Sequence, residues 1–231
     1  MDKQRLIVSD ITSSYKNKQV LKGISLSADK GQCVGIVGSN GCGKSTLLNI
    51  LAGLRKPDSG TVFFDGQEAK GIKRRQLFIQ YTGYVPQENN LIPELNVLDN
   101  LLLWYEDKQK LQKELEEGFL KELDLNSMCK LKVSKLSGGM KKKVSIGCAL
   151  AGNPPVLLLD EPDAALDIVG KNQIRQYLMS YKESGGTIII ATHEENDLSI
   201  CDKVYAVNGG KSTEIDKNLR GENLLRAVDI Y

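Results

Sequence analysis

One glycine-rich run constrains this sequence more than any other feature. Residues 38–45 read GSNGCGKS and fit the pattern G-x-x-x-x-G-K-[ST] in full. They follow an apolar run at 34–37 and lead into a stretch of helical character over 44–54. A strand, a glycine loop and a helix in this order turn backbone N–H groups and the positive end of the helix toward an anion. The sequence therefore predicts a site for nucleotide phosphates.

Each part of this loop has an expected role in ATP binding. Lys44 would reach the β- and γ-phosphates and support hydrolysis, Ser45 would coordinate Mg²⁺, and Thr46 would bond the α-phosphate. The small residues let the backbone close around the phosphates. The residues expected to bind ATP here are Gly38, Ser39, Asn40, Gly41, Cys42, Gly43, Lys44, Ser45 and Thr46.

Two adjacent carboxylates end a second apolar run. Residues 156–159 read VLLL, and Asp160 and Glu161 follow directly. At the carboxyl edge of a parallel sheet, we expect Asp160 to hold hydrated Mg²⁺. Because side chains alternate along a strand, Glu161 would point to the other side and act as general base or water-positioning group. Alone, such a strand end is structural as often as functional, and the glycine loop favours function.

His193 also stands at the end of an apolar run, residues 187–192. A lone histidine is more often a structural residue than a functional one. Its place at a third strand end favours the functional interpretation, in which a neutral imidazole bonds the γ-phosphate and orients the attacking water.

A second anion-binding helix start is predicted at Ser137, Gly138 and Gly139, just before a helical run that extends to about residue 152. An ordinary capped helix is the simpler interpretation of these residues taken alone. However, one chain would then carry two phosphate-binding ends, and a single ATP cannot easily occupy both. This raises the possibility of a site shared between two copies.

The hydrophobic pattern changes twice along the chain. Short strand-like runs at 6–9, 20–28, 33–37 and 61–64 precede residue 87, and helical spacing follows over about 96–125, with Leu111, Leu115, Phe119 and Leu123 on one face. After the prolines at 154–155, strand and helix alternate again. We expect one domain over 1–231, with a nucleotide-binding core (1–87 and 154–231) and a helical subdomain (about 88–153).

Composition excludes several classes of protein. Thirty-one Lys and Arg against twenty-nine Asp and Glu leave a net charge of +2, which does not indicate a nucleic-acid partner. The 5 cysteines are scattered without a C-x-x-C pair, as is typical of a reducing compartment. The longest apolar runs fall far short of the roughly 20 residues that span a bilayer. A membrane function would therefore need other chains to cross the bilayer.

Together, these motifs resemble the ATP-binding subunit of ATP-binding cassette (ABC) transporters, from about residue 7 to 210. The resemblance adds Tyr15 as the adenine-stacking aromatic and Gln87, which would touch Mg²⁺ or the attacking water. It implies an α/β P-loop NTPase (RecA-like) core with a mostly parallel sheet, an N-terminal antiparallel β subdomain and an inserted α-helical subdomain. Residues 165–167 are similar to the loop that crosses to the partner subunit.

The resemblance also implies an assembly. Two subunits, identical or not, would pack head to tail, with each ATP between one copy's glycine loop and the other copy's Ser137, Gly138 and Gly139. Membrane-spanning partner chains would bind this pair. Residues 88–103 are either their docking face, which we favour, or part of the core of the helical subdomain. The implied location is cytoplasmic, at the inner face of the cell membrane, and the implied activity is Mg²⁺-dependent ATP hydrolysis that drives transport.

One position departs from the family pattern, because Met140 stands where glutamine usually follows Ser-Gly-Gly. Backbone amides and the Ser137 hydroxyl can still hold a γ-phosphate, so we expect hydrolysis to persist. Met140 followed by three lysines is similar to subunits of drug, antibiotic or ion exporters and favours export. A soluble ABC ATPase acting in DNA repair or translation is the alternative, although the chain lacks that class's long coiled coil or second cassette. A P-loop kinase of small molecules does not explain Ser137 or His193.

Overall fold

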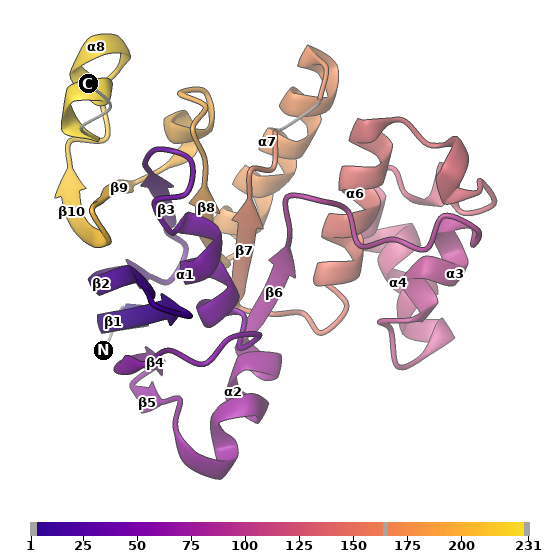
Figure 1. Cartoon of the computed structure of the whole chain (residues 1–231). Coiled ribbons are helices and arrows are strands. Elements are labelled where there is room, and N and C mark those ends of the chain that lie inside the picture. Colours follow the sequence, from indigo (N-terminus) through magenta and orange to yellow (C-terminus); the bar gives the residue numbers. More distant parts are fainter. Residues whose placement is uncertain (1–3, 164–165, 229–231) are drawn as a thin grey trace.

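Two β-sheets organise the chain (Figure 1), which this computed structural model describes over residues 4–163 and 166–228. The smaller sheet is antiparallel with the strand order β2-β1-β4-β5, and the larger has the order β10-β9-β3-β8-β7-β6. Neighbours in the larger sheet run parallel except for β9 and β10. The strands are β1 (Gln4–Tyr15), β2 (Lys18–Asp29), β3 (Cys33–Val37), β4 (Ser59–Phe64), β5 (Gln67–Glu68), β6 (Thr82–Val85), β7 (Val156–Asp160), β8 (Thr187–Ala191), β9 (Lys203–Asn208) and β10 (Lys211–Ile215).

Helices cover both faces of the larger sheet. The α-helices are α1 (Lys44–Leu51), α2 (Arg74–Tyr81), α3 (Val97–Leu102), α4 (Lys108–Glu117), α5 (Phe119–Glu122), α6 (Gly138–Ala149), α7 (Ile168–Glu183) and α8 (Gly221–Ala227). Short 3-10 turns are η1 (Gly71–Lys73), η2 (Asn126–Met128), η3 (Val133–Lys135) and η4 (Asp197–Ile200). Figure 1 shows α3, α4 and α6 gathered beyond the edge strand β6.

Strand β7 shows why the central strands are apolar on both sides. All of its residues are buried. Leu157 and Leu159 pack in a core that includes residues of α6 and α7, whereas Val156 and Leu158 pack in a second core with α1 and the smaller sheet. A parallel strand covered on both faces gives this continuous apolar run instead of strict alternation. The predicted fold, a mostly parallel sheet with an antiparallel sheet and inserted helices, is confirmed.

The helical region differs from the sequence prediction in one respect. The stripe that contains Leu111, Leu115 and Leu123 is buried, as its spacing indicates. It does not form one helix, because the backbone of Gly118 is extended and separates α4 from α5. A Cβ at this position would lie 2.2 Å from the Glu114 carboxylate. The extended backbone at this position turns the chain while the apolar face stays on the same core.

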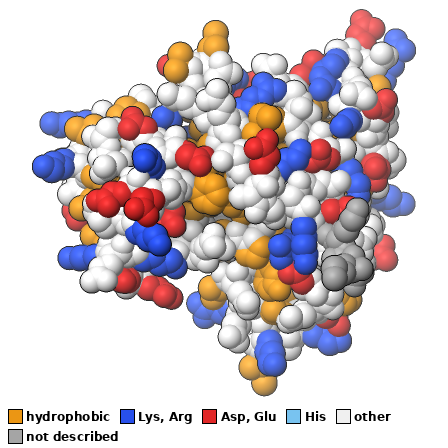
Figure 2. All heavy atoms as spheres, turned by 180° about the vertical axis from the view of Figure 1, so that it is seen from behind, with side chains coloured by type: hydrophobic (Ala, Val, Ile, Leu, Met, Phe, Trp, Pro, Cys, Tyr) orange, Lys and Arg blue, Asp and Glu red, His pale blue; other side chains and the backbone are white. Residues whose placement is uncertain are grey.

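Several elements gave too weak a pattern to be predicted. The helix α2 and the strands β6 and β10 are absent from the sequence prediction, because each is short and mixes polar with apolar residues. Within residues 4–163 and 166–228, no helix combines the length and apolar character that a bilayer crossing needs. Figure 2 shows acidic and basic side chains interspersed over one face of the molecule.

Candidate functional site

The glycine loop joins the end of β3 to the start of α1. Gly41 and Gly43 have φ angles of 79° and 115°, in the left-handed region that glycine adopts without strain. A Cβ on Gly43 would approach the Leu21 side chain to 2.5 Å, and one on Gly38 would approach the Val207 carbonyl oxygen to 2.5 Å. The glycines therefore let the loop pack closely against β2 and β9 while its backbone encloses a concave space.

Lys44 lies beneath this loop and is only 5% exposed. Its Nζ donates hydrogen bonds to the carbonyl oxygens of Gly38 at 2.8 Å and Ser39 at 3.3 Å. These contacts hold the ammonium group at the first turn of α1, where the positive end of the helix adds to its charge. The loop and Lys44 together create a strongly positive recess for an anion.

A cavity of about 530 Å³ opens from the loop. This volume falls in the range of sites that bind a small organic ligand. Tyr15, Gln87 and Glu161 line the cavity beside the loop, although they are far apart in the sequence. The remaining lining residues are Val20, Asn40, Gly41, Gly43, Lys44, Ser45 and Thr46.

Tyr15 presents its ring to this cavity and is supported by Arg55. The Arg55 guanidinium carbon lies 3.8 Å from the ring centroid, the geometry of a cation–π contact. Arg55 also donates hydrogen bonds to the Ser13 hydroxyl, at 2.9 Å, and to the Ser14 carbonyl oxygen, at 2.5 Å. Because one face of the ring is covered, the other is the face available for stacking. Arg55 was missed by sequence reasoning, since no local pattern marks it.

Asp160 is a buried carboxylate beside the phosphate loop. It is 3% exposed, and the Tyr84 hydroxyl lies 3.5 Å from its Oδ2. Burial raises the pKa of Asp160, and a hydrogen bond with Ser45 opposes this rise. Asp160 and Ser45, two of the residues predicted to hold Mg²⁺, thus lie close to each other. Tyr84 was also missed, because the pattern of β6 was too weak to place its side chain.

Three neighbouring strands bring Gln87, Glu161 and His193 together. Gln87 follows β6, Glu161 follows β7 and His193 follows β8, and these strands are adjacent in the sheet. Gln87 Nε2 donates to Glu161 Oε2 at 2.8 Å, and His193 Nδ1 lies 3.1 Å from Glu161 Oε1. Gln87 and His193 therefore each contact a different oxygen of the Glu161 carboxylate.

The backbone of Glu161 is unusual as well. Its φ angle is 48°, a left-handed conformation that is uncommon for a residue with a side chain. Its N–H donates to the carbonyl oxygen of Ala191 in β8, at 2.8 Å. Strained backbone conformations that the surrounding structure holds in place are frequent at functional sites, where a side chain needs a fixed orientation.

Ser137, Gly138 and Gly139 do not line the cavity. Ser137 caps α6, and its hydroxyl accepts a hydrogen bond from the Met140 N–H at 3.2 Å. Ser137 and Gly138 are exposed at this helix start. The two predicted phosphate-binding ends are therefore separate within one chain.

The predicted crossing loop is described only in part, because Ala165 lies outside the described residues. The Leu166 N–H donates to the Asp163 carbonyl oxygen at 3.3 Å. Asp167 caps α7, and its carboxylate accepts the Gly170 N–H at 2.7 Å.

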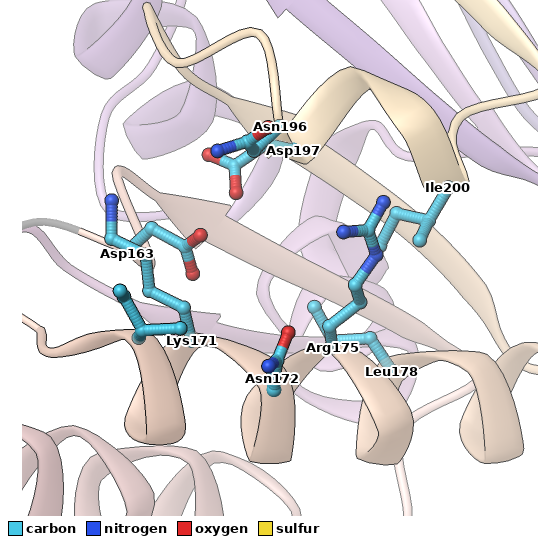
Figure 3. A pocket seen from close by; sticks show the side chains of 9 residues that line it. Asp163, Lys171, Asn172, Arg175, Leu178, Asn196, Asp197 and Ile200 are labelled. Carbon is cyan, nitrogen blue, oxygen red and sulfur yellow. The ribbon is translucent and has the colours of Figure 1, made fainter.

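A second cavity, of about 250 Å³, lies between α7 and η4 (Figure 3). Asp163 and Asp197 line it, and both are more than nine-tenths buried. Burial and a hydrogen bond with Asp163 raise the pKa of Asp197 to about 8, while a hydrogen bond from Thr192 opposes the rise. The raised pKa favours a proton on Asp197 near neutral pH, and the carboxyl pair joins the segment after Glu161 to the segment after His193.

Comparisons with known proteins identify one family. The ABC transporter family matches residues 21–164. The spermidine/putrescine import ATP-binding protein PotA of Mesoplasma florum is 36% identical over 222 residues, which are 93% of this chain and 62% of PotA. The lipoprotein-releasing system ATP-binding protein LolD of Bacteroides thetaiotaomicron is 36% identical over 209 residues, which are 86% of this chain and 95% of LolD.

A solved structure has the same fold. It is the dimeric ATP-binding cassette MJ0796 in a post-hydrolysis state bound to ADP and Pi, with 32% sequence identity and a TM-score of 0.81. The match covers 94% of this chain and 99% of the cassette. The chain spans about three fifths of the length of the PotA proteins that it matches.

Proposed function

This chain belongs to the ABC transporter family of ATP-binding proteins, and from that membership and the geometry of the cavity we propose that it binds and hydrolyses ATP to drive membrane transport. One observation carries the proposal: the phosphate loop and the Gln87–Glu161–His193 group meet at one cavity. The MJ0796 cassette, bound to ADP and Pi, supports hydrolysis as the reaction.

In this proposal the loop and Lys44 hold the phosphates, and Tyr15 stacks on the adenine. The Glu161 carboxylate accepts a proton from water as the water oxygen attacks the γ-phosphorus, and the bond to the β,γ-bridging oxygen breaks. Gln87 and His193 orient Glu161, and His193 contacts the γ-phosphate. The products are ADP and inorganic phosphate.

The residues near Asp160 fit a magnesium ion. Oxygen ligands suit this cation, and the hydroxyl of Ser45 and the carboxylate of Asp160 lie close to each other beside the phosphate loop. Gln87 would supply a further oxygen. When bound, the ion neutralises charge on the phosphate oxygens. Burial of Asp160 favours such a partner, because a buried carboxylate needs compensating charge.

A second copy or a related subunit would complete the site. Ser137, Gly138 and Gly139 lie at an exposed helix start away from the cavity of their own chain, so they are free to meet the ATP of a partner. The dimeric form of MJ0796 supports this arrangement. The partner's Ser137 hydroxyl and glycine N–H groups would then hold the γ-phosphate.

The transport role would require membrane-spanning partners, which place this chain at the inner face of the cell membrane. The relatives support transport over the soluble alternative, since PotA is named for import and LolD for lipoprotein release. Because these relatives are equally similar, export stays a prediction from Met140 and the lysines after it.

Replacement of Glu161 by Gln tests the proposal. We expect E161Q to bind ATP without turnover and to accumulate as an ATP-bound dimer in size-exclusion chromatography, since the general base is lost while the binding groups remain. E117Q, on the exposed end of α4, is the matched control and should hydrolyse ATP like the unmodified chain. A strictly monomeric E161Q that hydrolyses ATP at the normal rate would contradict both the catalytic role and the shared site.

A further inference from the structure

A buried lysine connects α6 to the loop that carries Gln87. Lys142 is 2% exposed and lies in the second turn of α6, five residues after the cap Ser137. Its Nζ donates hydrogen bonds to the carbonyl oxygens of Pro86 and Gln87, both at 3.1 Å. The contact spans more than fifty positions of sequence and joins the helical region to the end of β6.

Burial of an ammonium group is costly unless hydrogen bonds and opposite charges compensate it. Burial lowers the pKa of Lys142, and the nearby negative charges of Asp160 and Glu161 oppose this effect. The two carbonyl oxygens satisfy two of its three protons. The hydrogen bonds of this buried ammonium group and the negative charges near it all belong to segments beside the candidate ATP site.

These contacts hold the two peptide groups on either side of the Gln87 Cα. The Gln87 side chain is exposed, so packing alone does not hold it. With the Pro86 and Gln87 carbonyls anchored, Nε2 of Gln87 lies 2.8 Å from Glu161. Lys142 thus contacts the backbone of Gln87, and the side chain of Gln87 contacts the Glu161 carboxylate.

We propose that Lys142 is a positioning residue for ATP hydrolysis, which holds Gln87 in contact with Glu161 and ties that contact to the position of α6. This inference rests on the proposed function, in which Glu161 activates water. Because α6 begins at the Ser137 end that would meet the partner's ATP, a shift of this helix would move Gln87 in the chain's own site.

The neighbouring Lys141 provides a matched control. It is one residue away on the same helix and only partly buried, and its side chain makes no hydrogen bond or ion pair within the described residues. The variants K142M and K141M remove the same charge from the same helix. K142R keeps a cation that can donate to both carbonyl oxygens, and K142Q provides an uncharged variant if K142M does not fold.

We expect K142M to lower kcat at least tenfold while its KM for ATP stays within about twofold, because the loop and Tyr15 are untouched. K142R should recover part of kcat, and K141M should match the unmodified chain. A kcat of K142M within twofold of the unmodified chain would overturn the proposal. So would a parallel loss of kcat and ATP affinity that K142R does not recover, since that pattern indicates a purely structural role.

Hydrogen exchange of the nucleotide-free chain separates this inference from the proposed function. K142M should raise amide exchange in residues 87–90 and leave the glycine loop unchanged, whether or not the chain hydrolyses ATP. Unchanged exchange over 87–90 would refute the positioning role. An unmodified chain without ATPase activity would refute the proposed function, and the exchange result would still decide whether Lys142 orders this loop.

Discussion

Replacement of Asp197 by Asn should remove a pH dependence from the stability of this protein. In the smaller cavity, Asp197 lies against Asp163, and both carboxyl groups are buried (Figure 3). Asparagine has the shape of the protonated acid, donates a hydrogen bond to Asp163 and accepts one from Thr192. The variant therefore keeps the contacts of the neutral pair and loses only the ability to ionise.

The sign follows from the two states of Asp197. Its pKa is about 8 in the folded chain and near the ordinary 3.8 when unfolded. Between these values the unfolded chain has released the proton and the folded chain retains it, so raising the pH favours unfolding. The contribution of Asp197 to stability is thus largest below the unfolded pKa. It falls by at most ~1.4 kcal/mol per pH unit and levels off above the folded pKa.

Urea denaturation of both chains at intervals from pH 5.5 to 9 measures this effect. Other titrating groups are shared, so they cancel in the difference between the two chains. The stability of the original chain relative to D197N should fall from pH 5.5 to about 8 and then stay constant. A difference that does not change with pH would show that Asp197 is ionised in the folded protein at neutral pH, and the carboxyl pair would not hold a proton.

Three further changes test other parts of the structure. Alkylation of Cys42 should block ATP binding by filling the loop, and full binding of a fluorescent ATP analogue after complete modification would refute this. R55A should weaken ATP binding about 2- to 5-fold by calorimetry, because Tyr15 loses a cation–π contact worth ~0.5–1 kcal/mol; unchanged affinity would contradict it. G147A, with its Cβ 2.6 Å from Leu125, should cost ~1–3 kcal/mol in urea unfolding without altering ATP affinity; equal stability would show that the Leu125 side chain moves aside without cost.

The parts of the site that sequence could predict are those encoded by local chemistry. The glycine loop needs positive φ angles at Gly41 and Gly43 and close packing at Gly38 and Gly43, and only a narrow set of residues allows both. Likewise, strands buried on both faces produce apolar runs, and the polar residues at their ends, such as Glu161 and His193, then stand out. Parallel strands bring such ends to one edge of the sheet, so the grouping of these side chains could be expected before the structure.

Local pattern fails where tertiary packing decides the outcome. The spacing of Leu111, Leu115 and Leu123 is helical, yet Gly118 breaks the helix while all three leucines stay on one core. The spacing of apolar residues indicates which side chains are buried. A turn that keeps those side chains on the same core hardly changes the spacing, so the spacing does not reveal the turn. Helix α2 was missed for the opposite reason, because much of it is exposed and its pattern is weak.

The buried charged residues were the feature least predictable from the sequence. Lys142 stands within three consecutive lysines, a pattern that favours a solvated helix face. Its partners are two backbone carbonyl oxygens far away in sequence, and carbonyl oxygens leave no trace in residue identity. The same holds for Asp163 and Asp197, whose contact depends on how η4 packs beside the end of β7. An unpaired charge costs more free energy when it is buried than when it is exposed. Lys142, Asp163 and Asp197 therefore constrain the relative positions of the segments around the ATP site more strongly than their exposed neighbours do.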